Sequence, residues 1–145
     1  MDKKILDIYK LLQEIAWCFG SHGVNGECCG DLTLTEFIAL RKVLENADLS
    51  VQDIGNSINF TKSGATRIID RLERKGYVTR RRSPLNYRVC CITATEKGTE
   101  VVKNTMEKYS AYLEMILGDL DTPMIDNIKE ALEVLVESVH KHEPV

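Results

Sequence analysis

Nine basic side chains lie between residues 61 and 88, where only Asp70 and Glu73 oppose them. They are Lys62, Arg67, Arg71, Arg74, Lys75, Arg80, Arg81, Arg82 and Arg88. The segment carries a net charge of +7, so in a chain of net charge −3 the other 117 residues carry −10. Clustered cations neutralise phosphates and release their counterions, whereas the acidic remainder repels polyanions. The charge distribution predicts one nucleic-acid-binding face; the alternative is a solvated basic surface.

The elements that position these charges begin with a short helix. Ser50 and Asp53 have the spacing of a capping box, with Asp in place of the usual Glu. Three apolar residues then define one helical face: Val51, Ile54 and Ile58. Gly55 lowers helix propensity, but a small residue here allows a second helix to cross closely.

The second helix is predicted to follow a turn at Asn59 and Phe60, with Thr61 as its N-cap. Its apolar stripe is Ala65, Ile68, Ile69 and Leu72, and the opposite face carries Ser63, Arg67, Asp70 and Arg74, flanked by Thr66 and Arg71. Gly64 permits close approach to DNA. An apolar docking face opposite small polar groups and a guanidinium is typical of a recognition helix. The alternative is an ordinary surface helix.

A basic hairpin is predicted next. Gly76 has the position of a C′ glycine, residues 77–82 and 87–92 favour strands, and residues 83–86 favour a turn. We expect Arg88 to enter a narrow minor groove and the arginines at 80–82 to bind phosphates, with Arg81 and Arg82 as the chosen candidates. Because strand side chains alternate, some of the arginines at 80–82 must point away from DNA.

Residues 49–98 resemble the winged helix of the MarR family of bacterial and archaeal regulators. The family's wing pattern is D-x-R, a short strand and L-T-x-x-G. This chain has Asn86-Tyr87-Arg88, then Ile92-Thr93 and Thr95-Glu96-Lys97-Gly98. Asn86 stands where the family usually has Asp, so it cannot form an ion pair with Arg88.

The resemblance implies a mainly α fold: a winged helix-turn-helix with a two-stranded β wing and terminal dimerisation helices. It predicts a single domain over 1–145, with the DNA-binding part at 32–94 and dimerisation helices at 1–20 and 95–141. It also implies a homodimer that binds double-stranded DNA at a pseudo-palindromic operator, usually as a repressor released by a ligand or by oxidation. Carried over by position, Thr61, Lys62, Ser63, Thr66 and Arg67 face the major groove, and Arg88 faces the minor groove. The complete candidate set adds Ser50, Gly64, Arg71, Arg81 and Arg82.

Both ends of the chain independently favour a dimer. Apolar residues step by three and four at Ile5, Ile8, Leu12, Ile15 and Phe19, and again at Ile125, Ile128, Leu132, Leu135 and Val139. Between these seams, Thr93 and Glu96 predict a capping box that opens a long helix. Gly118 is expected to end it, and Thr122-Pro123 to begin the last helix. The alternative is that each seam packs within its own subunit.

Three cysteines could carry a signal. Cys28 and Cys29 lie in the predicted loop GSHGVNGECCGD, just after Cys18 and before a helix opened by Thr33 and Glu36. Adjacent thiols suit a soft metal, a metalloid or an oxidant. No C-x-x-C pair is present, so no standard zinc motif exists and no cofactor is certain. The alternative is that these thiols are incidental, and Cys90 and Cys91 should face opposite sides of a strand.

A small-molecule effector is the other signal considered. Trp17, Tyr9 and Phe37 could line a pocket for an aromatic ligand, although core packing would explain them equally. Other functional classes are an architectural DNA-binding protein without an effector and a thiol enzyme. The enzyme is disfavoured because only His22 could act as a base nearby. With no signal peptide or membrane-spanning run, we expect a cytoplasmic protein that does not contact membranes.

Overall fold

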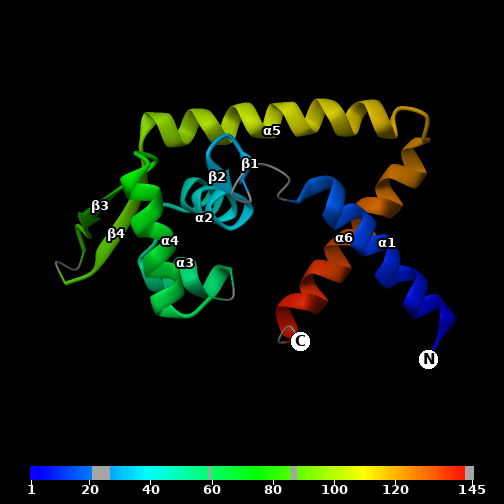
Figure 1. Cartoon of the computed structure of the whole chain (residues 1–145), viewed down its shortest axis with the longest axis horizontal. Helices are drawn as coiled ribbons and strands as arrows, with labels where there is room; N and C mark the ends of the chain where they lie inside the picture. Colours follow the sequence, from blue (N-terminus) through cyan, green and yellow to red (C-terminus); the bar gives the residue numbers. More distant parts are fainter. Residues whose placement is uncertain (21–26, 59, 86–87, 143–145) are drawn as a thin grey trace. The chain divides into compact units, whose positions relative to one another are not determined.

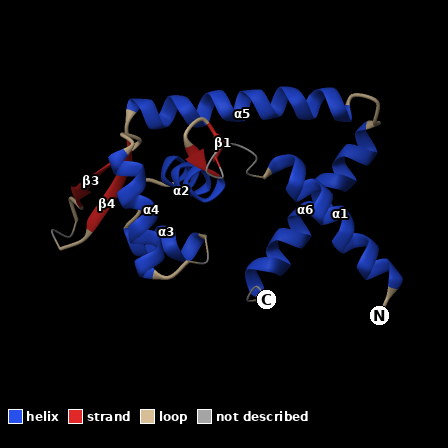
Figure 2. Cartoon of the chain, in the orientation of Figure 1, coloured by secondary structure: helices blue, strands red, loops and turns tan. Residues whose placement is uncertain are grey.

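A computed structural model describes residues 1–20, 27–58, 60–85 and 88–142. The helices are α1 (Lys3–Phe19), α2 (Leu34–Glu45), α3 (Val51–Ser57), α4 (Lys62–Arg74), α5 (Glu96–Leu117) and α6 (Thr122–Lys141). Two antiparallel strand pairs join β1 (Glu27–Cys29) to β2 (Leu32–Thr33) and β3 (Val78–Arg82) to β4 (Cys90–Ala94), as Figures 1 and 2 show. The chain divides into two compact units, Met1–Lys103 and Asn104–Val145, which are described separately.

The hydrophobic core of the first unit lies between α2, α3, α4 and the β3–β4 hairpin, which are close together in Figure 1. Its members are Cys29, Leu32, Phe37, Ala39, Leu40, Val43, Ile54, Ile68, Ile69, Leu72, Tyr77, Val78, Ile92 and Val102. Each of α2, α3 and α4 contributes one apolar face and leaves the other exposed. This mainly helical arrangement with one two-stranded wing is the predicted winged-helix fold.

Capping boxes begin α2 and α3, at the residues that were predicted to open these helices. Thr33 Oγ1 accepts a hydrogen bond from the Glu36 N–H at 3.2 Å, and Ser50 Oγ accepts one from the Asp53 N–H at 3.1 Å. Each carboxylate in turn accepts a hydrogen bond from the backbone N–H of its cap residue. These bonds satisfy donors that a helix N-terminus otherwise leaves unpaired.

The structure explains why glycine is present at two positions, for the reasons that the sequence predicts. A Cβ on Gly55 would lie 3.1 Å from the Ala65 Cβ, so a side chain here would push α3 away from α4. Gly76 has φ +86 and follows the last residues of α4, where a left-handed conformation reverses the chain.

The predicted start of α5 is wrong by two residues. Thr93 does not cap this helix, because it lies in β4 opposite Thr79. Thr95 is the capping residue, since its Oγ1 accepts a hydrogen bond from the Gly98 N–H at 3.1 Å. The strand therefore continues to Ala94, and the helix begins at Glu96.

The wing also departs from its predicted bounds. The returning strand begins at Cys90 and not at Tyr87, because Arg82 pairs with Cys90 and the Ser83 N–H donates to the Val89 carbonyl at 2.9 Å. Arg88 consequently lies in the connection between the strands and not on a strand. Asn86 and Tyr87 lie outside the described residues.

The segment expected to be a loop before α2 contains a short strand pair. Glu27 in β1 pairs with Thr33 in β2, and Cys29 pairs with Leu32. This pairing is accompanied by full burial of Leu32, which belongs to the core. The predicted loop is therefore wrong for 27–29, while residues 21–26, with His22, lie outside the described part of the chain.

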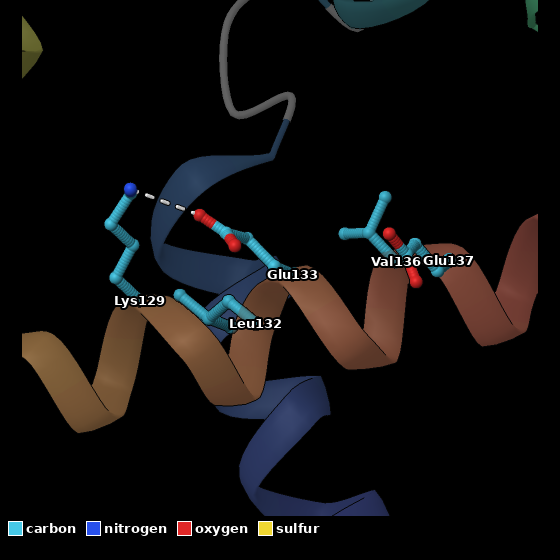
Figure 3. A pocket seen from close by; sticks show the side chains of 5 residues that line it. All are labelled: Lys129, Leu132, Glu133, Val136 and Glu137. Carbon is cyan, nitrogen blue, oxygen red and sulfur yellow. Dashed lines mark ion pairs between the residues drawn. The ribbon is translucent and has the colours of Figure 1, made fainter.

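The second unit contains the later part of α5 and α6. Helix α5 ends at Leu117, directly before Gly118, and Asp121 Oδ1 accepts a hydrogen bond from the Met124 N–H at the start of α6. No residue of the described range 104–142 is buried. A shallow hollow of about 450 Å³ on α6 is lined by Lys129, Leu132, Glu133, Val136 and Glu137 (Figure 3). Among the described residues, no helix combines the length and apolarity needed to span a lipid bilayer.

Candidate nucleic-acid interface

Helix α4 has one buried and one exposed face, as its sequence predicts. The buried stripe is Ala65, Ile68, Ile69 and Leu72, and each of these residues is at most 2% exposed. Lys62, Ser63 and Arg67 lie exposed on other sides of the helix. The helix can therefore dock on the core while its N-terminal half presents donors outward.

Short-range hydrogen bonds arrange the first turn of α4. Thr61 Oγ1 accepts from the Gly64 N–H at 3.1 Å and lies 3.2 Å from Ser63 Oγ. Thr66 Oγ1 donates to the Lys62 carbonyl at 2.9 Å, so its remaining capacity is that of an acceptor. The hydroxyl groups predicted to face DNA are thus held in defined positions on one turn.

The two predicted arginines of α4 differ in their surroundings. Within the described part of the chain, exposed Arg67 has no ion-pair partner. Arg71 Nε lies 3.7 Å from Glu36 Oε2, so its charge is partly balanced inside the protein. Arg67 is therefore the better placed of the two for a base edge, while Arg71 lies beside a buried carboxylate.

Glu36 is a fully buried carboxylate beside the end of α4, and the sequence indicated only its role as a capping residue. Burial tends to raise its pKa, but hydrogen bonds from the Thr33 N–H and the Lys75 ammonium outweigh burial and hold the pKa below its ordinary value. Lys75 Nζ lies 3.1 Å from Glu36 and donates to the Asp31 carbonyl at 2.6 Å. This carboxylate thereby ties α2 to the end of α4.

Tyr77 continues the same network at the root of the wing. Burial, followed by the hydrogen bond that its hydroxyl donates to Asp31, raises the pKa of Tyr77 to about 12. The ammonium of Lys97 lies 4.5 Å from the centre of the Tyr77 ring, within the range of a cation–π interaction. These contacts join the β1–β2 turn, the wing and the first turn of α5.

The three consecutive arginines of β3 have different environments, although alternation along a strand predicts only that some of them point away from DNA. Arg80 turns toward α4 and forms ion pairs with Asp70 at 2.5 Å and Glu73 at 2.6 Å. Arg81 pairs with Asp48 at 3.0 Å, and both of these side chains are about half exposed. Arg82 is exposed at the end of the strand. Arg81 and Arg82 thus remain candidates for phosphate contacts, whereas Arg80 is neutralised within the protein.

The structure places the remaining candidates as follows. Arg88 is exposed in the wing connection, and half-buried Ser50 uses its hydroxyl to cap α3. Exposed Cys18 lies on α1 and Cys29 is buried in the core, while the Cys28 side chain lies outside what the structure describes. Among the described residues, no three His, Cys, Asp or Glu side chains are grouped as metal ligands.

The other cysteines and the candidate ligand pocket are also placed. Cys91 is buried, with its Sγ 3.4 Å from the Asp48 carbonyl, and Cys90 is half-buried beside it on β4. Phe37 belongs to the core, while Trp17 on α1 is 71% exposed. Core packing therefore accounts for Phe37, and a ligand pocket shared with Trp17 stays a prediction.

A helix-turn-helix followed by an antiparallel basic hairpin defines the winged-helix class of transcriptional regulators. Residues 32–90 match the model of the MarR family, the same family that residues 49–98 resemble. The chain is 28% identical to the HTH-type transcriptional regulator MhqR of Bacillus subtilis over 112 residues, which cover 77% of this chain and 72% of MhqR. The match to the uncharacterised regulator YdgJ of the same organism is 24% identical, and it spans 68% of this chain but only 60% of YdgJ.

Solved structures share the fold over nearly the whole chain. A MarR family protein from Bacillus stearothermophilus has a TM-score of 0.76 at 28% identity, with 95% of this chain and 97% of that chain covered. FabT of Streptococcus pneumoniae, solved in complex with DNA, has a TM-score of 0.78 at 20% identity, with 97% and 99% covered. These similarities show a shared fold, and both curated relatives named above are HTH-type transcriptional regulators.

Proposed function

We propose that this regulator is a homodimer that binds a pseudo-palindromic DNA operator and represses transcription until an effector releases it. The observation that carries this proposal is the exposed first half of α4, where Lys62, Ser63 and Arg67 lie away from the buried stripe. FabT, which shares the fold and was solved in complex with DNA, supports DNA binding by this chain. A regulator of this kind works on the chromosome, so we expect it in the cytoplasm.

We assign base reading to α4 and phosphate binding to the wing. Arg67 is the candidate for bidentate hydrogen bonds to a guanine in the major groove. Arg81 and Arg82 are candidates for phosphate contacts, which position the protein without specifying sequence. Arg88, in the wing connection, is the candidate for the minor groove.

The test is selection of bound sites from random duplex DNA, followed by substitution. Arg67→Ala should cost about 1–3 kcal/mol of binding free energy and relax the preference at one position per half-site. Arg41→Ala is the matched control, because Arg41 lies on α2 and pairs with Glu45. Retention of both affinity and preference by Arg67→Ala would show that α4 is not the reading helix. An architectural protein would instead show little preference among sequences at fixed salt.

The dimer proposal rests on the second unit, in which no described residue is buried. Amphipathic helices gain most of their stability by burying an apolar face, so the seam of α6 requires a partner surface. On this seam Leu132 is 45% exposed, and it lines the hollow of Figure 3 beside the ion pair of Lys129 with Glu133. A second copy of the chain offers the same seam in return.

Sedimentation equilibrium tests the dimer. Leu132→Asp should place a charge in the seam and shift the protein toward monomer, whereas Val134→Asp should not, because Val134 lies off the seam and is 59% exposed. A native protein that sediments as a monomer at micromolar concentration would contradict the dimer.

For the effector we propose thiol chemistry at Cys28 and Cys29, with an aromatic ligand as the alternative. Operator binding should be measured with an oxidant, a trivalent arsenical and a soft metal ion on the native protein and on Cys28→Ser and Cys29→Ser separately. Because Cys29 is 8% exposed, we expect the Cys28 variant to lose more of the response. An unchanged affinity of the native protein under all three treatments would leave the aromatic ligand as the effector to test.

A further inference from the structure

We propose that Phe60 and Gly64 together read the methyl group of a thymine in each half-site. The methyl group packs against the Phe60 ring in the space that Gly64 leaves on the first turn of α4. This inference rests on the proposed operator binding and adds to it one base and the chemical group by which that base is recognised.

Phe60 is an aromatic residue held at the surface. It immediately precedes Thr61, the N-cap of α4, and its side chain is 42% exposed. Its backbone N–H donates to the Gly55 carbonyl at 2.8 Å, which ties this residue to α3. The ring is therefore presented from a backbone that both helices of the motif hold in place.

Gly64 keeps the neighbouring surface open. Its backbone does not adopt a positive φ, so helical geometry does not require glycine here, and glycine within a helix costs about 1 kcal/mol relative to alanine. A Cβ at this position would lie 3.2 Å from Oγ1 of Thr61, the capping hydroxyl, and 3.9 Å from both Cβ and Cδ2 of Phe60. Any side chain on residue 64 would thus occupy the space beside the ring.

Polar groups surround this apolar notch, which we define as the Phe60 ring and the surface of Gly64. Exposed Thr61, Lys62 and Ser63 lie on the same turn. The N-terminal residues of a recognition helix contact base edges in the major groove. There, thymine alone among the four bases presents an apolar group, its C5-methyl, and phenylalanine is one of the side chains that contacts it.

The competing explanation is local and structural. A hydrophobic residue before the N-cap can pack on the fourth residue of the helix, which here is Ala65. Such packing would hold the chain at the helix entry but would be indifferent to the methyl groups of DNA. The two explanations therefore differ in one measurable property.

The experiment replaces each thymine of the selected operator, one at a time, by uracil, which removes only the C5-methyl group. For the native protein we expect one position per half-site at which uracil weakens binding about fourfold, the effect of withdrawing one methyl group from an apolar contact. Phe60→Ala should bind the thymine operator about fourfold more weakly and show no further loss with uracil at that position.

Two further variants complete the test. Gly64→Ala fills the notch and should abolish the discrimination between thymine and uracil; because the new methyl group also lies 3.2 Å from the capping hydroxyl of Thr61, its effect is compared with that of Phe60→Ala. Leu44→Ala removes a similarly exposed apolar side chain, at 38%, from α2 and should keep both affinity and discrimination. Circular dichroism on each variant checks that the fold is intact.

Two results would contradict the proposal that the notch reads a thymine methyl group. One is that the native protein distinguishes thymine from uracil at no position, and the other is that Phe60→Ala distinguishes them as well as the native protein does. Both leave the proposed operator binding intact, since the native protein still selects a site. If the native protein selects no site from random DNA, the operator proposal itself is wrong, and the notch is wrong with it.

Discussion

Arg80 on β3 and Asp70 on α4 form an ion pair, with 2.5 Å between Nη2 and Oδ1. Glu73 binds the other guanidinium nitrogen at 2.6 Å. The hydrogen bond to Asp70, reinforced by the charge of Glu73, raises the pKa of Arg80 above its ordinary value despite partial burial. One arginine thus joins the wing to α4 and pairs with the only two carboxylates between residues 61 and 88.

Arg80→Ala should weaken DNA binding although Arg80 is turned toward the protein. Two uncompensated carboxylates would then repel phosphates from the surface of α4, with an expected loss of about 1 kcal/mol that shrinks at high salt. The free energy of unfolding should fall by about 1 kcal/mol, because the ion pairs are partly exposed. Operator titrations at two salt concentrations and urea unfolding measure the two effects.

The control for charge is a triple variant, Arg80→Ala with Asp70→Asn and Glu73→Gln. It removes the repulsion together with the clamp, so DNA affinity should return toward that of the native protein. A triple variant as weak as Arg80→Ala would mean that geometry, and not charge, is what Arg80 contributes.

We expect Asp48 to compete with DNA for Arg81. Asp48→Asn should raise affinity for all sequences alike, because it frees the guanidinium from an ion pair of 3.0 Å. Asn also tolerates the positive φ of 58 found at this position. Arg81→Ala should do the opposite and reduce the slope of log affinity against log salt by about 0.9, one phosphate contact. An Arg81→Ala slope equal to the native one would exclude this phosphate contact.

Arg88→Ala should weaken binding most on operators whose flanks are rich in A·T pairs. Narrow A·T minor grooves have the most negative potential, and a guanidinium inserted there reads groove width. Affinities for matched operators with A·T-rich and G·C-rich flanks measure this preference. Equal losses on both would make Arg88 a phosphate contact.

Glu36 should make the fold sensitive to acid. Its pKa is held below the ordinary value of 4.5, so its stabilisation is present above about pH 4.5 and is lost as the pH falls through the lower folded value. Glu36→Gln should lower the free energy of unfolding by about 2 kcal/mol at neutral pH, and it should reduce the further loss of stability at low pH. Urea unfolding between about pH 3 and pH 7, a range that includes the ordinary carboxyl pKa, measures this dependence of stability on pH. Exposed Glu45→Gln is the control. An equal loss of stability at low pH in the native protein and in Glu36→Gln would contradict this role.

The helix-turn-helix was predictable because its signals are local. The capping box at Ser50, the cap at Thr61 and the apolar stripe of α4 are each set by residues within one or two turns of one another. The start of α5 was not predictable in the same way, because Thr93 and Thr95 are both plausible caps. Only the pairing of Thr93 with Thr79 across the wing decides between them.

The charge network of the site was equally hidden from sequence. A run of three arginines shows that the strand is basic, but not that Arg80 meets Asp70 ten residues earlier or that Arg81 meets Asp48 thirty-three residues earlier. The alternation of side chains along a strand indicated only that the arginines do not all face the same side. The one usable signal was the presence of just two carboxylates in a basic segment, which indicates that they have designated partners.

Thr95 joins three elements with one side chain and one amide. Its hydroxyl donates to the Gly76 carbonyl at 2.7 Å and accepts from the Gly98 N–H, while its own N–H donates to the Tyr77 carbonyl at 2.9 Å. In mechanical terms, Thr95 couples the first turn of α5 to the end of α4 and the root of the wing. A displacement of the first turn of α5 would therefore act on the end of α4 and the root of the wing through the hydrogen bonds of Thr95 to Gly76 and Tyr77.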